Sequence, residues 1–296
     1  MDRTKQSYIY AGFAVFFWST IPTIFKIGLG ELDVLTMLAL ATFTSTSVLL
    51  IIVIAGRKTD LLKKSTRRDL LTSALLGLIN PFIYYIILLK AYKLLPAQVA
   101  QPLNMIWPII LVFLSVPILK QKIPLKSFAA LLISFAGVYI ISSQGNPLHP
   151  GKSDTAGVLL ATGSSFFWAL YFIFNMKNKR DESVKLFTNF LFASFYLLVA
   201  MLIFGNSGSP ISFKGAAASV YVGIFEMGIT FYFWLKALRL ATTSDKISNL
   251  VYLAPFISLV FVHFIIKEPV YFTTPAGLLL IIGGIFIQNR RSKPTV

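Results

Sequence analysis

The chain has 296 residues, of which 56% are hydrophobic and 13% are charged, and its mean hydropathy is +0.76. A soluble globular domain has about a quarter of its residues charged, so this composition excludes an ordinary soluble protein. Apolar runs of about 18 or more residues recur along the chain, and runs of that length predict membrane-spanning helices. The chain has no cysteine, which excludes disulfides and cysteine-ligated metals.

The apolar runs predict an all-α integral membrane protein with ten transmembrane helices. The expected helices cover residues 7–29, 34–55, 69–91, 96–119, 124–143, 156–176, 186–205, 214–237, 243–266 and 271–289. Gly, Pro and Ser gather in residues 143–154, which indicates a linker between two halves. The expected domains are therefore residues 1–143 and 156–296, with five helices each, joined by an extracytoplasmic linker over residues 144–155.

The net charge of +16 is distributed unevenly across the predicted membrane. When alternate loops are assigned to alternate sides, 21 of the 27 Lys and Arg residues fall on the side that holds both termini. The positive-inside rule then predicts a multi-pass protein of the cell membrane with both termini in the cytoplasm. The basic excess lies beside anionic lipid, so the bilayer is the expected partner and nucleic acid is not.

Residues 76–108 are repeated, with changes, as residues 222–255. At a shift of 146, Gly77 aligns with Gly223 and Asn80 with Glu226, and at a shift of 147 Pro108 aligns with Pro255. Because each half has five helices, the second half enters the membrane from the opposite side and the repeat is inverted. Inverted repeats are a building plan of secondary transporters, with the substrate site near the midplane between the repeats.

The first helices of the two halves also match, with Trp18 aligned with Trp168 at a shift of 150. Each half begins with a helix that holds small and aromatic residues. The fourth and ninth helices contain Pro, and the last helix of each half contains Gly (FAGVYII, IGGIFI). Together these features are typical of one family. Over nearly its whole length the chain resembles the drug/metabolite transporter superfamily, in its EamA-type branch. The resemblance implies a central cavity lined by helices 1, 3, 4, 6, 8 and 9, supported by helices 5 and 10. It also implies export of amino acids or related metabolites. The family commonly ends helices 4 and 9 in an acidic residue, which Glu268 fits and Gln121 does not.

Glu226 is the one acidic residue of eleven that falls at mid-span. It follows Lys214 by 12 residues, about 18 Å along a helix at 1.5 Å per residue. A charge at that depth costs at least ~2.5 kcal/mol, so the side chain should face the bundle interior and be paired or protonated. Glu226 is thus a candidate partner for a proton or a substrate ammonium. A neutral carboxyl that is hydrogen-bonded to another helix is the alternative.

Other polar and aromatic residues at bilayer depth either line a cavity or hold helices together, and the sequence leaves both roles open. Shared helix faces give the expected substrate-binding set: Trp18, Asn80, Tyr84, Gln101, Asn104, Trp107, Trp168, Tyr171, Glu226, Thr230, Asn249 and Tyr252. Prolines within the apolar runs permit either fixed kinks or gating hinges. Gly283 and Gly284 allow close helix approach, within the monomer or in a homodimer.

The sequence has no Gly-rich phosphate loop, no metal-spaced His/Glu cluster and no Ser/His/Asp set, so no enzyme activity, cofactor or metal site is expected. It predicts a secondary transporter or facilitator that moves a small organic metabolite, first of all an amino acid, by alternating access. Protons are the candidate coupled ion. Aromatic rings and one acid equally fit an exporter of drugs or cationic compounds. A non-transporting membrane protein, such as a receptor subunit or a lipid-modifying enzyme, is the remaining alternative.

Overall fold

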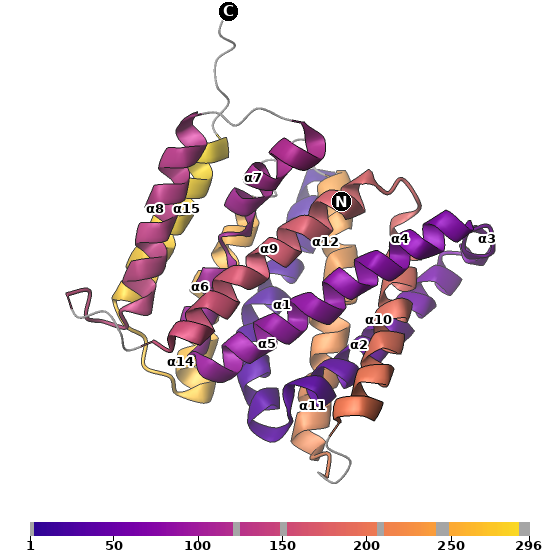
Figure 1. Ribbon diagram of the computed structural model, residues 1–296, viewed down its shortest axis with the longest axis horizontal. Helices are drawn as coiled ribbons and strands as arrows, with labels where there is room; N and C mark the ends of the chain where they lie inside the picture. The colour runs from indigo at the N-terminus through magenta and orange to yellow at the C-terminus, as the bar shows by residue number, and fades with distance from the viewer. Residues whose placement is uncertain (1–2, 121–124, 149–152, 206–209, 241–248, 290–296) are drawn as a thin grey trace, which may run out of the picture.

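The computed structural model describes residues 3–120, 125–148, 153–205, 210–240 and 249–289, and the secondary structure of these residues is helical throughout (Figure 1). The first half contains α1 (Arg3–Glu31), α2 (Val34–Ala55), α3 (Thr59–Lys63), α4 (Arg67–Gly77), η1 (Leu78–Ile83), α5 (Tyr84–Leu94), α6 (Ala97–Asn104), α7 (Trp107–Leu119) and α8 (Leu125–Ser142). The second half contains α9 (Thr155–Lys177), α10 (Glu182–Phe204), α11 (Phe213–Tyr221), η2 (Val222–Glu226), α12 (Ile229–Leu240), η3 (Asn249–Leu253), α14 (Ala254–Ile266) and α15 (Thr273–Asn289).

These elements account for the ten expected spans, and the prediction of an all-helical membrane protein is confirmed. Within the described residues, six spans of 21 to 29 residues are long and apolar enough to cross a membrane, and shorter apolar helices make up the rest. Four expected helices are interrupted, which the sequence did not predict. The third span is α4–η1–α5, the fourth is α6–α7, the eighth is α11–η2–α12 and the ninth is η3–α14. The expected start of the ninth span, at residue 243, lies outside the described residues.

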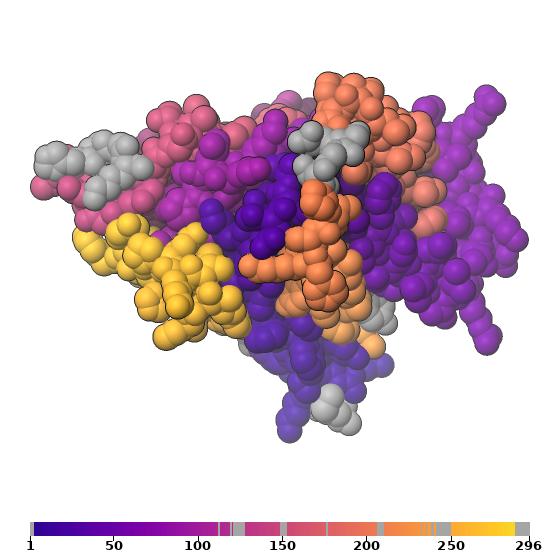
Figure 2. All heavy atoms as spheres, turned by 90° about the horizontal axis from the view of Figure 1, so that it is seen from below, coloured from indigo at the N-terminus to yellow at the C-terminus, as the bar shows by residue number. Residues whose placement is uncertain are grey.

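Packing between the helices follows the twofold relation expected of the repeat. α1 packs along α12 and its counterpart α9 packs along α5, while α2 packs against α10. α8 and α15 pair with each other and form one end of the molecule, with α3 and α4 at the other end (Figures 1 and 2). The pairs α1–α12 and α5–α9 lie between these two ends and enclose the interior.

Helix starts are capped by polar side chains at repeat-related positions. Asp33 accepts hydrogen bonds from the backbone of α2, and Asp181 does the same for α10. Thr66 caps α4 and its counterpart Ser212 caps α11. Such caps satisfy backbone N–H groups that a helix leaves free at its first turn. Burial alone would raise the pKa of Asp181, but donation from Ser183 and Lys58 lowers the pKa below its usual range, so this cap stays ionised at neutral pH.

Two helix ends repeat as well. Lys120 follows the last residue of α7 and Lys267 that of α14, both in the left-handed conformation with φ of 55° and 56°. The N–H of Lys120 bonds to the Ser115 carbonyl, and that of Lys267 to the Val262 carbonyl. The twofold relation therefore extends to the backbone conformation of single residues, although Lys is an unusual choice for this region.

The pairing of α8 with α15 depends on small residues. A Cβ on Gly137 would lie 2.6 Å from the Gly277 carbonyl oxygen, and one on Gly284 would lie 2.8 Å from that of Ala130. Gly283, the neighbour of Gly284, has no atom within 4 Å of the corresponding position. The two helices therefore touch through their backbones on one face only.

This contact predicts opposite effects for two identical substitutions. We expect Gly137→Ala to destabilise the protein by about 1–3 kcal/mol, because the added methyl overpacks the contact. This cost exceeds the roughly 1 kcal/mol by which alanine stabilises a helix relative to glycine. Gly283→Ala should leave stability unchanged or raise it, since the added methyl meets open space. Thermal unfolding of both variants in detergent measures the difference. Equal shifts for the two variants would contradict the packing.

Candidate functional site

The interrupted spans break at mid-membrane, next to the interior. In η1, Asn80 has extended backbone angles, with φ of −146° and ψ of 122°, inside an otherwise helical span. The repeat-related break is η2, which ends at Glu226. Gly77 comes directly before η1 and Gly223 lies within η2, and a Cβ on either would overlap a backbone carbonyl of the facing helix, α10 or α2. These glycines let the neighbouring helices approach closely where each span is interrupted.

Each break frees backbone groups that need partners inside a membrane. The Ser45 hydroxyl of α2 donates to the Met227 carbonyl at 3.0 Å, beside the break at η2. The Ser165 hydroxyl of α9 donates to the Asn104 carbonyl at 2.8 Å, where α6 meets α7. At two of the breaks, hydroxyls from neighbouring helices thus provide backbone carbonyls with hydrogen-bond partners.

Glu226 lies at the end of η2 and is half-buried. The Tyr85 hydroxyl of α5 donates to its Oε1 atom at 2.9 Å. Five ion pairs occur among the described residues, and none of them includes Glu226. The carboxyl therefore has a hydrogen bond from the other half of the protein, and no described Lys, Arg or His nitrogen lies within 4.0 Å of it.

Aromatic rings from five helices meet beside this carboxyl. The Trp168 ring of α9 lies 5.1 Å from Tyr84, 6.4 Å from Trp107 and 6.1 Å from Phe231, measured between ring centroids. Phe231 of α12 also lies 6.1 Å from Trp18 of α1. Phe231 thus stands between the two repeat-related tryptophans. Trp18, Trp107, Trp168 and Phe231 are each half-buried, so part of each ring is exposed.

A polar network adjoins these rings. The Tyr84 hydroxyl donates to Asn104 Oδ1 at 3.3 Å, and Asn104 Nδ2 donates to Ser164 Oγ at 2.7 Å. The network joins α5, the end of α6 and α9. We call the joined group the central cluster; it consists of Trp18, Tyr84, Tyr85, Asn104, Trp107, Ser164, Trp168, Glu226 and Phe231.

A second polar group lies near the C-terminal end of α1 and connects the two halves. Glu268 accepts a hydrogen bond from the Ala97 N–H at 2.8 Å, at the start of α6. Lys26 Nζ lies 4.0 Å from Glu268 and donates to the carbonyls of Tyr92 and Leu95 at the end of α5. The carboxylate meets the positive end of the α6 dipole and the ammonium meets the negative end of α5, so both charges are favourably placed.

Comparison with known proteins identifies the fold and its family. A protein-family model described as the EamA-like transporter family matches residues 5–143 and again residues 155–290. The chain belongs to the EamA-like transporter family. It is a multi-pass membrane transporter of the drug/metabolite transporter superfamily, and not an enzyme.

Relatives of this EamA protein include uncharacterised transporters from bacteria and archaea. The chain is 26% identical to the uncharacterised transporter YvbV of Bacillus subtilis, over 99% of this chain and 94% of that protein. It is 23% identical to an uncharacterised transporter of Archaeoglobus fulgidus, over 97% and 99% of the two chains. A crystal structure with 19% identity superposes with a TM-score of 0.67 over 96% of both chains, which shows the shared fold.

The EamA fold brings together seven of the residues expected in the site and places the others elsewhere. Trp18, Tyr84, Asn104, Trp107, Trp168 and Glu226 belong to the central cluster. Tyr171 adjoins it at 6.1 Å from Trp168, but its hydroxyl accepts from Asn189 of α10. Asn80 is 2% exposed and its Oδ1 has no partner among the described residues.

The remaining expected residues are used differently. The Thr230 hydroxyl is fully buried and donates to the Phe225 carbonyl within the broken span. Tyr252 packs on Phe286 of α15, at 5.7 Å between rings, and so lies on the supporting side of η3. Gln101 is half-buried in α6, with no side-chain hydrogen bond among the described residues. Asn249 starts η3, and its side chain lies outside the described part of the structure.

Three members of the central cluster, Tyr85, Ser164 and Phe231, were not expected from the sequence. Tyr85 and Phe231 occupy equivalent positions in the two halves, at the same shift of 146 that aligns Asn80 with Glu226. That shared shift was the available signal, because it marks Tyr85 and Phe231 as counterparts at matching depth in the two halves.

The cluster predicts a strong effect of truncating its central ring. We expect Trp168→Ala to weaken transport by about 10-fold or more, since each aromatic pair contributes roughly 0.5–1.5 kcal/mol beyond burial and Trp168 has several neighbours. Trp168→Phe should restore part of the loss. Uptake by proteoliposomes of a solute that the wild type transports measures both variants.

Phe166→Ala is the matched control, because Phe166 lies on the same helix and its side chain is 42% exposed on the outer surface. It should transport at the wild-type rate. If Trp168→Ala also transports at that rate with an unchanged KM, the ring is packing and not part of the substrate site.

Proposed function

We propose that this EamA protein moves a small organic solute that carries an ammonium or another cationic group, first of all an amino acid, out of the cell by alternating access. Glu226 provides the charge partner of the solute at mid-membrane. The rings of the central cluster provide the surface on which its uncharged part packs. The basic excess of 21 of 27 residues on one side supports a cytoplasmic location for both termini.

The proposal rests on one observation: none of the described residues provides a cationic partner for the Glu226 carboxyl. An ionisable group at mid-membrane is expensive unless it has a partner, and such groups mark substrate or proton pathways. Tyr85 gives Glu226 one hydrogen bond, and the described residues give it no ion pair. A solute ammonium would complete the pairing, and a proton would neutralise the carboxyl when the solute is absent.

Alternating access has a structural basis in the repeat and in the group around Glu268. The two halves have equivalent folds, so one can rock against the other about a fixed central site. The bonds from Lys26 and Ala97 to Glu268 join α1 and α6 to the end of α14. Opening of the transporter at this end requires that these bonds break, and they stabilise the closed arrangement of that end.

An exporter of cationic compounds is the second candidate, and one observation favours it. The central cluster contains a carboxylate and several rings, but no described Lys or Arg that would hold the carboxylate of an amino acid. Paired solutes separate the candidates: an amino acid such as phenylalanine, and phenethylamine, which lacks only its carboxylate. Transport of the amine alone favours the cationic class, and transport of phenylalanine favours the amino acid class.

Glu226→Gln tests the proposal directly, because it keeps the size of the side chain and removes its charge. We expect it to reduce transport of the preferred solute by about 10-fold or more, since a hydrogen bond to a charged group contributes roughly 1.5–3 kcal/mol. If Glu226 exchanges a proton for solute, the pH dependence of transport is also lost. The measurement is proteoliposome uptake between pH 5.5 and 8.

Glu31→Gln is the control, because Glu31 forms an ion pair with Lys214 at 3.2 Å, where Lys214 is 67% exposed. Pairs of this kind contribute at most ~1 kcal/mol, so transport should not change. Wild-type transport by Glu226→Gln across the whole pH range would make Glu226 a structural residue and refute the proposed site.

A further inference from the structure

A cleft of about 670 Å³ opens between α4 and α9, away from the central cluster. Its lining includes Arg68, Asp69, Leu75, Phe174, Lys177 and Lys179. The cleft lies where α4 begins and α9 ends, which is the membrane side with most of the basic residues. Neither the repeat nor the proposed transport mechanism requires a cavity in this place.

The cleft is a departure from the twofold relation between the halves. The counterparts of α4 and α9 are α11 and α1, and these two helices pack closely. Thr20 hydrogen-bonds Tyr221 at 2.8 Å, and Gly215 lies directly against Leu32. α4 and α9, by contrast, scarcely touch. The space between them is therefore specific to this side of the molecule.

One end of the cleft is basic. Arg68 and Lys179 are exposed, and neither forms an ion pair among the described residues. Lys177 donates to the Ile118 carbonyl at 3.0 Å and keeps further N–H groups free. The one acid, Asp69, accepts from Thr66 in a capping box and lies 3.6 Å from Arg180. Asp69 also interacts with Arg68, but three basic side chains stand against this one acid in the lining, so the cleft keeps a net positive charge and attracts anions.

The wall deeper in the membrane is apolar. Leu75 is 64% exposed and Phe174 is 37% exposed, and Ile79 of η1, one turn after Leu75, continues this wall toward mid-membrane. A free anion would use only the basic end. A phospholipid uses both parts, because its phosphate lies at the level of the headgroups and its acyl chain extends into the hydrocarbon region.

We propose that this cleft binds an anionic phospholipid, with its phosphate at Arg68 and Lys179 and an acyl chain along Leu75 and Phe174. Basic pockets between transmembrane helices are suited to such headgroups. Arginine can hold a phosphate with two parallel hydrogen bonds, and lysine adds a second charge. A zwitterionic lipid would bring its own ammonium toward three basic side chains and bind more weakly.

Native mass spectrometry of the full chain in detergent, with added phosphatidylglycerol or phosphatidylcholine, tests this proposal. We expect the wild type to retain phosphatidylglycerol at least several-fold better than phosphatidylcholine. Arg68→Gln combined with Lys179→Gln should abolish this preference. Leu75→Trp, which fills the apolar wall and keeps the charges, should also reduce retention of phosphatidylglycerol.

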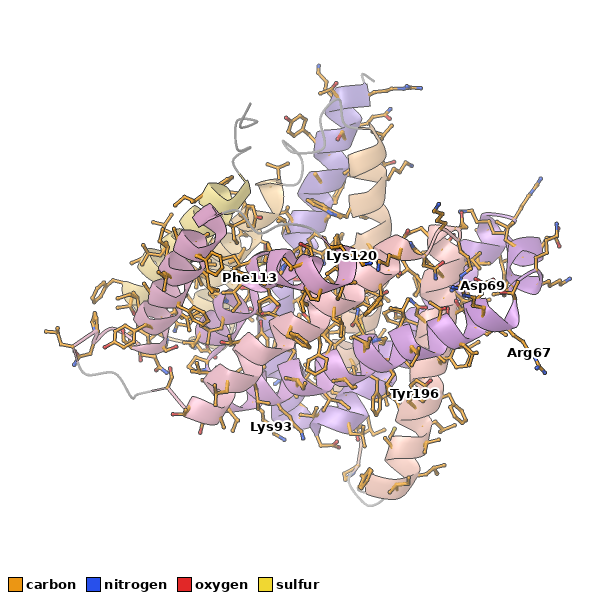
Figure 3. The ribbon with its side chains drawn as sticks, turned by 45° about the horizontal axis from the view of Figure 1, so that its top comes forward. Arg67, Asp69, Lys93, Phe113, Lys120 and Tyr196 are labelled. Carbon is orange, nitrogen blue, oxygen red and sulfur yellow. The ribbon has the colours of Figure 1, made fainter. Side chains whose placement is uncertain are left out.

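The control is the double variant Lys64→Gln with Arg67→Gln, which also removes two positive charges, but from residues beside the cleft. Both residues are exposed and outside the cleft, and the Arg67 side chain points away from the molecule while Asp69 lies on the inner side of α4 (Figure 3). This pair should retain lipid as the wild type does, and unfolding temperatures without lipid should be equal. Equal loss in both pairs would overturn the proposal, as would displacement of phosphatidylglycerol by equimolar inorganic phosphate, which would show a simple anion site.

Discussion

The structure depends on one constraint: a backbone group inside a membrane must find a hydrogen-bond partner. An unbroken helix meets this requirement by itself, as α1, α2, α8, α9, α10 and α15 do. The spans that break at mid-membrane need help, and Ser45 and Ser165 supply it to the freed carbonyls of Met227 and Asn104. Broken helices are therefore tolerated only where neighbouring helices surround them, and that place is the interior between the repeats.

The twofold relation provides a symmetric scaffold with asymmetric chemistry. Tyr85 and Phe231 are counterparts, and so are Glu226 and Asn80. The Tyr85 hydroxyl donates to Glu226, whereas the equivalent pair of Phe231 and Asn80 has no hydroxyl, and the buried Asn80 Oδ1 has no partner among the described residues. One hydroxyl and one carboxyl thus distinguish the halves. As a result, the charge of the site lies in the second half while the residue that orients it lies in the first.

Much of the scaffold could be predicted from the sequence, because hydrophobic length and charge are properties of whole segments. The prediction of ten spans, two inverted halves and the family resemblance did not depend on how each helix is rotated about its axis. Gly77 and Gly223 align in the repeat, and the structure shows that both lie close to a neighbouring helix, α10 or α2. The breaks were not predicted, since a proline such as Pro81 indicates a kink without showing where the backbone leaves the helix.

The site was harder to predict, because it depends on the direction in which each side chain points. Trp168 and Tyr252 looked equivalent as aromatic residues at bilayer depth, yet one reaches the central cluster and the other packs on Phe286. Thr230 shares a helix face with Glu226, but its hydroxyl serves the broken backbone. A rotation of one residue along a helix decides between these roles, and composition and spacing do not determine that rotation.

The central claim is that the broken spans enclose a water-accessible site around Phe231 and Glu226. The chain has no cysteine, so Phe231→Cys introduces a single thiol at the centre of the cluster, and Phe166→Cys introduces one on the lipid-facing side of α9. A charged, membrane-impermeant thiol reagent measures access to both. The account predicts that Phe231→Cys reacts, that the transported solute slows this reaction, and that Phe166→Cys does not react. An unreactive Phe231→Cys, or a rate that saturating solute leaves unchanged, would contradict it.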